Sequence, residues 1–261
     1  MARYAISDLH GHYKLYEQVK KKLKVNDLLY VLGDCADRGP DGWKTLKVVI
    51  DDPQCLLVLG NHEDMLRQTM EVWFELDHDN YPEEDIIWTK EYELLSMNGG
   101  THTFWDWLEE PEDEQLYYYH RLMKLPLEYI IYDSRCGRPL ILTHAGYTPW
   151  KMPKSVDDFV WDRNHFFDMW KANKVLDKAI VIHGHTPQQY LWEYLIEGAD
   201  FYKRPYDMNY FEVLGQDHTG AELYNLTYAD GHKICIDPGT IMSKRGILMN
   251  LDTLEQEIIK F

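Results

Sequence analysis

The chain has 261 residues, of which 45% are hydrophobic and 14% aromatic, so it can form a sizeable core and lacks the composition of a disordered protein. Lys and Arg number 27 against 44 for Asp and Glu, and the formal net charge of -17 argues against nonspecific binding to nucleic acid or anionic membranes. This length fits one large α/β domain, so we predict a single domain over residues 1–261.

Cysteine usage and hydropathy indicate the compartment. The cysteines Cys35, Cys55, Cys136 and Cys235 show no CxxC spacing and lie mostly in or beside apolar runs, which predicts neither a zinc cage nor a disulfide framework. No apolar stretch approaches the length that crosses a membrane. We therefore expect a cytoplasmic protein with reduced thiols and no membrane partner.

The first third of the sequence alternates short apolar runs with helical patterns. Strands are expected at residues 4–6, 28–32 and 56–59, and helices at residues 13–23 and 43–50. This βαβαβ order predicts an α/β fold. Each apolar run ends in a polar cluster, and open α/β sheets form their sites where the carboxyl ends of strands meet the following loops.

The remaining two thirds mix helical and β patterns. Residues 64–124 are expected to be helical because their apolar side chains form stripes at helical spacing. Residues 198–230 combine aromatic and turn residues, which indicates an inserted hairpin or lid. Further strands, the first two of them paired as a hairpin, are expected at residues 127–132, 140–143, 179–182, 233–237 and 245–251.

Side chains that bind metals follow five of these expected strands. They are Asp8, His10, Asp34, Asn61, His62, His144 and His185. Oxygen and imidazole donors without thiolate suit manganese, iron or zinc. Two adjacent divalent ions activate water and stabilise both the attacking and the leaving oxygen of a phosphate ester. The pattern therefore predicts a two-metal phosphoesterase that forms no covalent intermediate.

The motifs DLHG, GDCADRG, GNHE, THAG and GHTP, in this order, resemble those of the calcineurin-like metallophosphoesterases of the PPP phosphoprotein phosphatase type. The resemblance extends with gaps from Arg3 to about Asp252 and is closest to small bacterial and phage members. Many diesterases of the wider superfamily carry a second histidine where GHTP has Pro187, which favours the PPP branch. The resemblance implies a sandwich of two mixed β-sheets flanked by helices.

The resemblance also implies a metal site of six ligands. Asp8 and His10 are implied to bind the first ion, and Asp34 to bridge the two ions. Asn61, His144 and His185 are implied to bind the second ion. The expected cofactors are two divalent ions, with manganese as the first choice and iron or zinc as alternatives.

Four further residues receive catalytic roles from the resemblance. His62 is expected to act as the general acid for the leaving oxygen, with Asp37 holding its ring. Arg38 and Arg163 are expected to bind the phosphate, because a planar guanidinium suits bidentate contact with phosphate better than lysine does.

Three functions remain open at this point. The leading expectation is a serine/threonine protein phosphatase, and the alternative that shares every motif is a symmetrical bis(5'-nucleosyl)-tetraphosphatase. A noncatalytic phosphate-binding protein is the third, although retention of His62, Asp37 and both arginines argues against it. The expected partner is thus a phosphorylated protein or a nucleotide, without a nucleic-acid duplex. Residues that can line a base pocket, or simply pack, are Trp150, Tyr202, Lys203, Arg204, Tyr206 and Tyr210.

Overall fold

The structure is a computed structural model. It describes residues 1–76, 83–147, 155–163, 178–190, 211–228 and 231–261. Within these residues no helix is both long and apolar enough to cross a membrane. The aromatic and basic residues expected at positions 150 and 202–210 lie outside the described residues.

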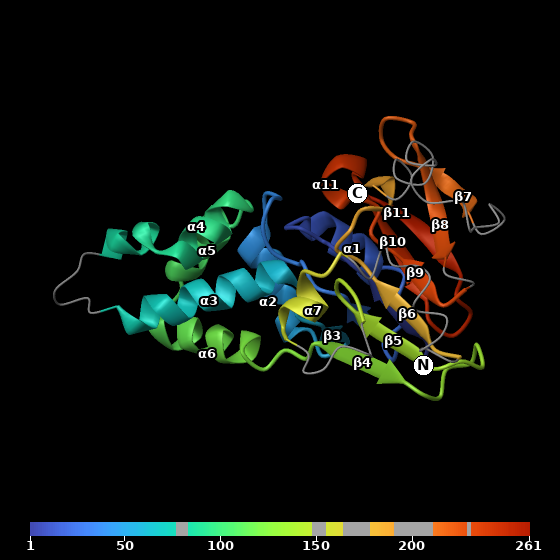
Figure 1. Cartoon of the computed structure of the whole chain (residues 1–261), viewed down its shortest axis with the longest axis horizontal. Coiled ribbons are helices and arrows are strands. Elements are labelled where there is room, and N and C mark those ends of the chain that lie inside the picture. The colour runs from blue at the N-terminus through green and yellow to red at the C-terminus, as the bar shows by residue number, and fades with distance from the viewer. Residues whose placement is uncertain (77–82, 148–154, 164–177, 191–210, 229–230) are drawn as a thin grey trace.

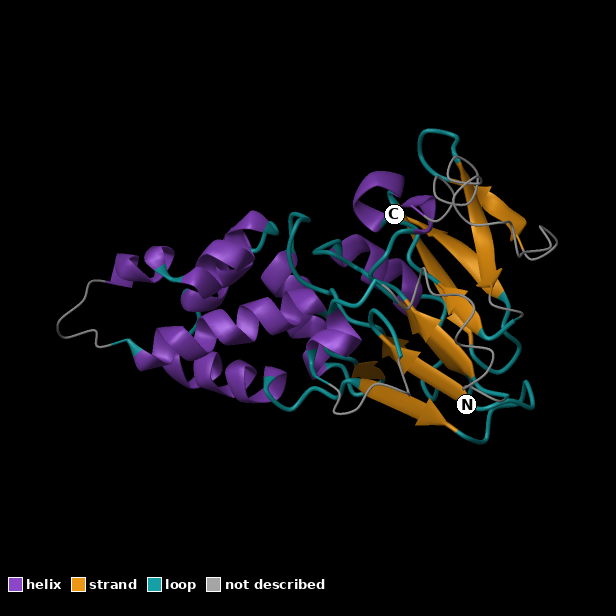
Figure 2. Cartoon of the chain, in the orientation of Figure 1, coloured by secondary structure: helices purple, strands orange, loops and turns teal. Residues whose placement is uncertain are grey.

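Two β-sheets form the centre of the molecule (Figures 1 and 2). The first has the order β11-β10-β1-β2-β3, with β1 parallel to β2 and β2 parallel to β3. Its strands are β1 (Arg3–Ile6), β2 (Leu28–Val31), β3 (Cys55–Leu57), β10 (Arg245–Asn250) and β11 (Gln256–Lys260).

The second sheet has the order β4-β5-β6-β9-β8-β7, and its middle strands β5, β6 and β9 are parallel. Its strands are β4 (Glu128–Ile131), β5 (Leu140–Thr143), β6 (Ile180–His183), β7 (Phe211–Gln216), β8 (Glu222–Tyr228) and β9 (Lys233–Cys235). Both sheets therefore combine parallel and antiparallel pairs.

Helices pack on the first sheet and extend from the sandwich as an arm, which Figure 1 shows on the left. Helices α1 (Tyr13–Lys20) and α2 (Gly42–Asp51) contact β11 and β3, respectively. The arm consists of α3 (Asn61–Glu75), the 3-10 helix η1 (Glu83–Trp88), α4 (Lys90–Met97), α5 (Thr101–Leu108) and α6 (Glu112–Leu122). Two short helices lie elsewhere, α7 (Asp157–Val160) and α11 (Thr240–Ser243).

Alternating side chains of the strands fill two separate cores, because successive residues of a strand point to opposite faces. On β2, Leu29 and Val31 join the core beneath the helices, whereas Tyr30 joins the core between the sheets. Leu140 and Leu142 of β5 belong to the same intersheet core. Burial of each such leucine contributes about 1.5–3 kcal/mol, so both faces of the first sheet are strongly held.

The predicted α/β fold and the sandwich of two mixed sheets are confirmed, and the expected strands and helices appear within a few residues of their expected ends. Strand β11 was not expected from the sequence. The described part of the 198–230 segment forms the antiparallel pair β7–β8 at the edge of the second sheet. Residues 198–210 lie outside the described residues.

Candidate functional site

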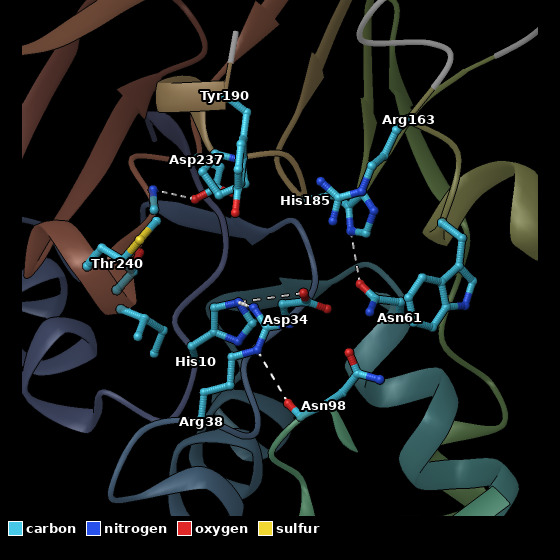
Figure 3. Close-up of a pocket in the computed structure, with 15 residues that line it drawn as sticks. His10, Asp34, Arg38, Asn61, Asn98, Arg163, His185, Tyr190, Asp237 and Thr240 are labelled. Atoms are coloured by element: carbon cyan, nitrogen blue, oxygen red, sulfur yellow. Dashed lines mark hydrogen bonds and ion pairs between the residues drawn. The ribbon is translucent and has the colours of Figure 1, made fainter. Parts of the chain in front are cut away.

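The ten residues predicted for the site lie together where the carboxyl ends of the parallel strands meet. Figure 3 shows those that line the cavity, which are His10, Asp34, Arg38, Asn61, Arg163 and His185. They follow β1, β2, β3, β5 and β6 or belong to the loops and helix ends beside them. The set consists of Asp8, His10, Asp34, Asp37, Arg38, Asn61, His62, His144, Arg163 and His185. The structure thus brings all ten into one site, and most of them are buried.

Several of these residues have a backbone conformation that is rare outside glycine. Asp8, His10, Asp34 and His185 have φ angles of 53°, 42°, 54° and 65°. A left-handed conformation costs a non-glycine residue about 1–2 kcal/mol, and such residues concentrate at functional sites. The turns at the strand ends therefore orient these side chains toward the site and accept local backbone strain in doing so.

Glycines beside these residues permit the close approach. A Cβ on Gly60 would lie 2.4 Å from Asp34 Oδ1, and a Cβ on Gly184 would lie 2.1 Å from Asp8 Oδ2. Both distances are far inside van der Waals contact. The glycines of the GNHE and GHTP motifs are thus required by the packing of the carboxylates next to them.

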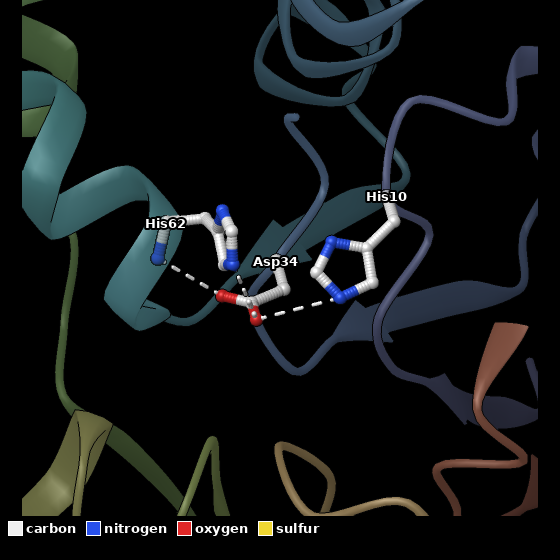
Figure 4. A group of neighbouring side chains, drawn as sticks. All are labelled: His10, Asp34 and His62. Carbon is white, nitrogen blue, oxygen red and sulfur yellow. Dashed lines mark hydrogen bonds and ion pairs between the residues drawn. The ribbon is translucent and has the colours of Figure 1, made fainter. Parts of the chain in front are cut away.

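Asp34 lies at the centre of the site (Figure 4). Its Oδ2 lies 3.8 Å from His10 Nε2 and 3.9 Å from His62 Nε2, and its Oδ1 lies 3.3 Å from His144 Nε2. Burial favours the neutral carboxyl, but His144 and His62 outweigh it and hold the pKa of Asp34 well below its usual value. Asp34 is therefore an ionised carboxylate between two groups of imidazoles.

Asn61 connects the two histidines of the second sheet. Its Oδ1 lies 3.0 Å from His144 Nε2 and 3.0 Å from His185 Nδ1. His144 Nδ1 lies 2.7 Å from the carbonyl of Leu32, so it donates there and Nε2 faces Asn61 and Asp34. Burial alone would lower the pKa of His144, but the neighbouring Asp34 outweighs this effect and raises the pKa to about 9. In the metal-free protein a proton on His144 thus compensates the central carboxylate.

His62 and Asp37 form a buried pair. His62 Nδ1 lies 2.7 Å from Asp37 Oδ2, and both side chains are inaccessible to solvent. Although burial opposes the charged ring, Asp34 and Asp37 raise the pKa of His62. The other ring nitrogen, Nε2, is buried without a hydrogen-bond partner among the described residues. This geometry can present a proton on Nε2 to a bound group.

The two arginines line the cavity from different sides (Figure 3). Arg38 Nη1 lies 3.2 Å from His10 Nε2, and its Nε donates to the carbonyl of Asn98 at 3.3 Å. Arg163 Nη1 donates to Thr186 Oγ1 at 3.3 Å. The cavity has a volume of about 360 Å³ and combines these cations with His10, Asp34, Asn61 and His185.

Glu63 was not assigned a role from the sequence, although it ends the GNHE motif. It is fully buried, and its carboxylate accepts hydrogen bonds from the backbone N–H groups of Asp34 at 2.7 Å, Cys35 at 2.8 Å and Gly60 at 3.2 Å. Burial and the neighbouring Asp34 raise the pKa of Glu63 to about 7. The glutamate therefore fixes the turn that presents the central carboxylate.

Asp237 was also not assigned a role from the sequence. It follows β9, lines the cavity and is buried. Burial raises its pKa to about 6, and burial together with Asp237 raises the pKa of Asp8 well above its usual value. The signal was its position: like the other site residues, it comes directly after an apolar strand.

His183 does not line the cavity. It is fully buried in β6, where Nε2 lies 2.6 Å from the hydroxyl of Tyr228 and Nδ1 lies 3.0 Å from the carbonyl of Gly184. Burial lowers its pKa to about 3. This histidine is a neutral packing group of the second sheet.

The residues present fit two divalent cations. His10, Asp34 and His62 form one group whose ligand atoms lie within 4.8 Å of one another, and Asp34, His144 and His185 form another. His185 Nε2, like His62 Nε2, is buried without a described partner. Crowding of the buried carboxylates of this site is unfavourable without positive charge beside them. The donor set combines imidazole, carboxylate and amide groups without thiolate, a combination that manganese, iron and zinc accept.

A model of the calcineurin-like phosphoesterase family matches residues 1–217, which is more than half of the chain. The chain therefore belongs to the calcineurin-like phosphoesterases. Members of this family usually bind two divalent metal ions, which agrees with the two ligand groups around Asp34.

Two curated relatives are both described as symmetrical bis(5'-nucleosyl)-tetraphosphatases. The protein from Cellvibrio japonicus (strain Ueda107) is 29% identical over 211 residues, which are 77% of this chain and 63% of that protein. The one from Nitrosospira multiformis is 30% identical over 113 residues, which are 38% of this chain and 41% of that protein. The match thus spans less than two thirds of either relative.

The fold has a counterpart among solved structures. A crystal structure of a protein provisionally assigned as a diadenosine tetraphosphatase superposes with a TM-score of 0.55 at 13% identity and covers 98% of this chain and 92% of that chain. At such an identity the likeness shows the fold alone.

Proposed function

We propose that this chain is a dinuclear metal-dependent phosphoesterase that cleaves a dinucleoside tetraphosphate symmetrically into two nucleoside diphosphates. The observation that carries the chemistry is the position of Asp34 between two groups of histidines, with the His62–Asp37 pair beside it. The names of the curated relatives support the choice of substrate. This choice ranks the dinucleotide above the phosphoprotein that the motifs alone favoured.

Six residues would hold the ions. Asp8 and His10 would hold the first ion, Asp34 would contribute to both positions, and Asn61, His144 and His185 would hold the second ion. When bound, the metal pair supplies Lewis-acid chemistry, which withdraws charge from phosphoryl oxygens and makes water more acidic. Manganese is our first choice, and iron or zinc are alternatives.

His62 would donate the proton that the leaving oxygen needs. Asp37 holds Nδ1 at 2.7 Å, and Asp34 and Asp37 together raise the pKa of the ring, which favours the doubly protonated form with a proton on Nε2. His62 also lies within reach of Asp34, but a protonated imidazole is not a metal ligand. The pairing with Asp37 therefore favours the role of acid over the role of ligand.

Arg38 and Arg163 would bind the phosphoryl oxygens. Their guanidinium groups supply positive charge inside a protein whose net charge of -17 repels anions. Charge-assisted hydrogen bonds of this kind are about twice as strong as neutral ones. The local cations thus make an anionic substrate acceptable to an acidic protein.

A serine/threonine phosphoprotein is the second candidate substrate. Its support is the GHTP motif, in which Pro187 occupies the position where many related diesterases carry a histidine. Proline has no side-chain donor for a metal. The same ligand set would hydrolyse a phosphate monoester, so the two candidates differ only in what the cavity walls accept.

The test is a direct comparison of two substrates. The manganese-loaded protein is assayed for kcat/KM with diadenosine tetraphosphate and with a phosphothreonine peptide, and the products are separated by chromatography. We expect ADP as the sole nucleotide product and a preference for the dinucleotide of more than about tenfold, which is about 1.4 kcal/mol. Preference for the peptide would establish the second candidate, and failure to hydrolyse either would leave a noncatalytic phosphate-binding protein.

A further inference from the structure

The cavity of the candidate site has a lining of two kinds. The charged and imidazole groups that would bind metals and phosphate make up one part. The other part is apolar and consists of Trp161, Pro187, Tyr190, Ile241 and Met242. The whole cavity has a volume of about 360 Å³, which lies in the range of small-molecule sites. Phosphate chemistry uses the first part and leaves the second without a function.

Two apolar side chains of this lining remain accessible. Tyr190 is 50% exposed and Met242 is 53% exposed. Figure 3 shows the ring of Tyr190 extending from the chain into the space above Asp34. A half-exposed aromatic ring contributes little to a core, whereas every nucleobase offers a flat face on which such a ring stacks. Tyr190, Ile241 and Met242 are called the shelf from here on.

The two chain segments that carry the shelf are joined to each other. The backbone N–H of Gln188 donates to the carbonyl of Asp237 at 3.0 Å, and Gln189 Nε2 donates to the carbonyl of Pro238 at 2.7 Å. The side chain of Gln188 also accepts the N–H of Tyr224 from β8 at 2.7 Å. The backbone segments that carry the shelf are therefore held together before a ligand arrives, which reduces the entropy lost on binding.

A buried hydroxyl lies in the same lining. Thr240 is 1% exposed, and its Oγ1 has no hydrogen-bond partner among the described residues. A buried polar group without a partner is costly, and such groups in a binding site are usually satisfied by the ligand. Thr240 directly precedes the shelf residues Ile241 and Met242 and lines the same cavity, but its Oγ1 is covered by protein atoms, so the exposed ring of Tyr190 is the surface that a ligand meets first.

We propose that the shelf, with Tyr190 as its aromatic surface, binds a nucleobase and thereby selects nucleotides over other phosphate esters. This specificity role rests on the proposed function, because the diphosphate of the same ligand would occupy the metal and arginine side of the cavity. The shelf does not itself take part in bond cleavage.

Binding to the full-length manganese-loaded protein tests the shelf without reference to turnover. Isothermal titration calorimetry compares ADP with ribose 5-diphosphate, which carries the same phosphates and sugar and lacks only the base. We expect the wild type to bind ADP about five- to a hundredfold more tightly, the range of base–aromatic stacking. Tyr190→Ala should abolish this preference, and Tyr190→Phe should retain it because the ring is kept.

The matched control is Tyr132→Ala. Tyr132 is 77% exposed after β4 and does not line the cavity, so its loss should leave the ADP preference of the wild type. Equal binding of both ligands by the wild type, or an undiminished preference in Tyr190→Ala, would overturn the shelf. Loss of the preference in Tyr190→Phe would also overturn it, since stacking would not be the cause. A shelf that binds ADP in a protein that does not cleave the dinucleotide would refute the proposed function alone.

Discussion

The two halves of the site are held in different ways. In the first half, between Asp8 and Glu63, the strand-end turns are bonded to one another: His10 N donates to the carbonyl of Asp34 at 2.8 Å, and Glu63 accepts several N–H groups of the next turn. In the second half, Arg163 is exposed and donates to Thr186 Oγ1 at 3.3 Å. Arg38 of the first half is exposed as well, whereas His144 and His185 of the second half are buried. The turns of the first half thus hold the central carboxylate in place, and the exposed edge of the second half, at Arg163, is open to a ligand.

This difference leads to an expectation for substitutions. Changes in the first half should act on metal content and folding stability, because the ligands, the turns and the core are one connected structure there. Changes at the exposed edge of the second half should act on substrate binding. The following predictions test this division from the largest expected effect to the smallest.

Asp34→Asn should have the largest effect. The amide is neutral and attracts a divalent cation far less than the carboxylate does, and Asp34 belongs to both groups of candidate ligands, so metal occupancy should fall at both positions. The metals would stabilise the transition state by several kcal/mol, so their loss should reduce turnover by about four orders of magnitude or more. Elemental analysis of the purified variant measures the occupancy, and two ions per chain in Asp34→Asn would refute the bridging role.

His62→Asn should leave the metals in place and reduce turnover by about two to four orders of magnitude, as loss of a general acid commonly does. The defect should shrink for substrates whose leaving group is a good one, since these need no proton. Measurement of kcat for a series of phosphate esters of decreasing leaving-group pKa checks this. A uniform defect across the series, or undiminished turnover, would remove His62 from the role of acid.

In each half of the site the sequence located the proposed metal ligands and missed one buried acid. Every proposed ligand lies next to its strand in a short motif, so residues such as Asp8, His10, Asp34 and Asn61 could be chosen from position and chemistry alone. Asp237 was missed because Pro238 and Gly239 after it are typical turn residues, and the sequence alone does not distinguish a site residue from a turn residue there. Glu63 was missed because its partners are backbone groups of a distant turn, which no side-chain pattern in the sequence records. Strand β11 was missed because its pairing with β10 depends on tertiary contacts.

Removal of each arginine in turn should affect metal binding differently, because the two side chains have different neighbours. Arg163→Ala should lower kcat/KM by about ten- to a hundredfold through loss of a charged hydrogen bond to the substrate, with metal content unchanged. Arg38→Ala should lower kcat/KM similarly but strengthen metal binding, because Arg38 Nη1, 3.2 Å from His10 Nε2, donates to the lone pair with which His10 would bind an ion, and its charge opposes a cation there. Metal titration of both variants, together with their kcat/KM values, measures this difference. Equal metal affinities would contradict the proposed difference between the halves.

Glu63→Gln should lower stability more than activity. One oxygen of the carboxylate is replaced by an NH₂ group that faces backbone N–H donors, which costs about 1–3 kcal/mol. The melting temperature should fall, and the loss should be visible in the metal-free protein as well. Glu71→Gln on the same helix α3, where this side chain is exposed, is the matched control. An unchanged melting temperature in Glu63→Gln would show that the turn is stable without these bonds.

Asp27→Asn, far from the metal ligands, should have the smallest effect and depend on pH. Backbone N–H groups of Ala2 at 2.7 Å and Lys24 at 3.0 Å hold the pKa of Asp27 below its usual value. A depressed carboxyl pKa gives stability that is present above the unfolded pKa of about 3.9 and disappears as the pH falls through the folded pKa. The variant should therefore lose about 1 kcal/mol at pH 7 and progressively less as the pH falls below about 4. Urea unfolding at several pH values measures this, and a loss that stays constant down to acid pH would show that the charge of Asp27 is not its cause.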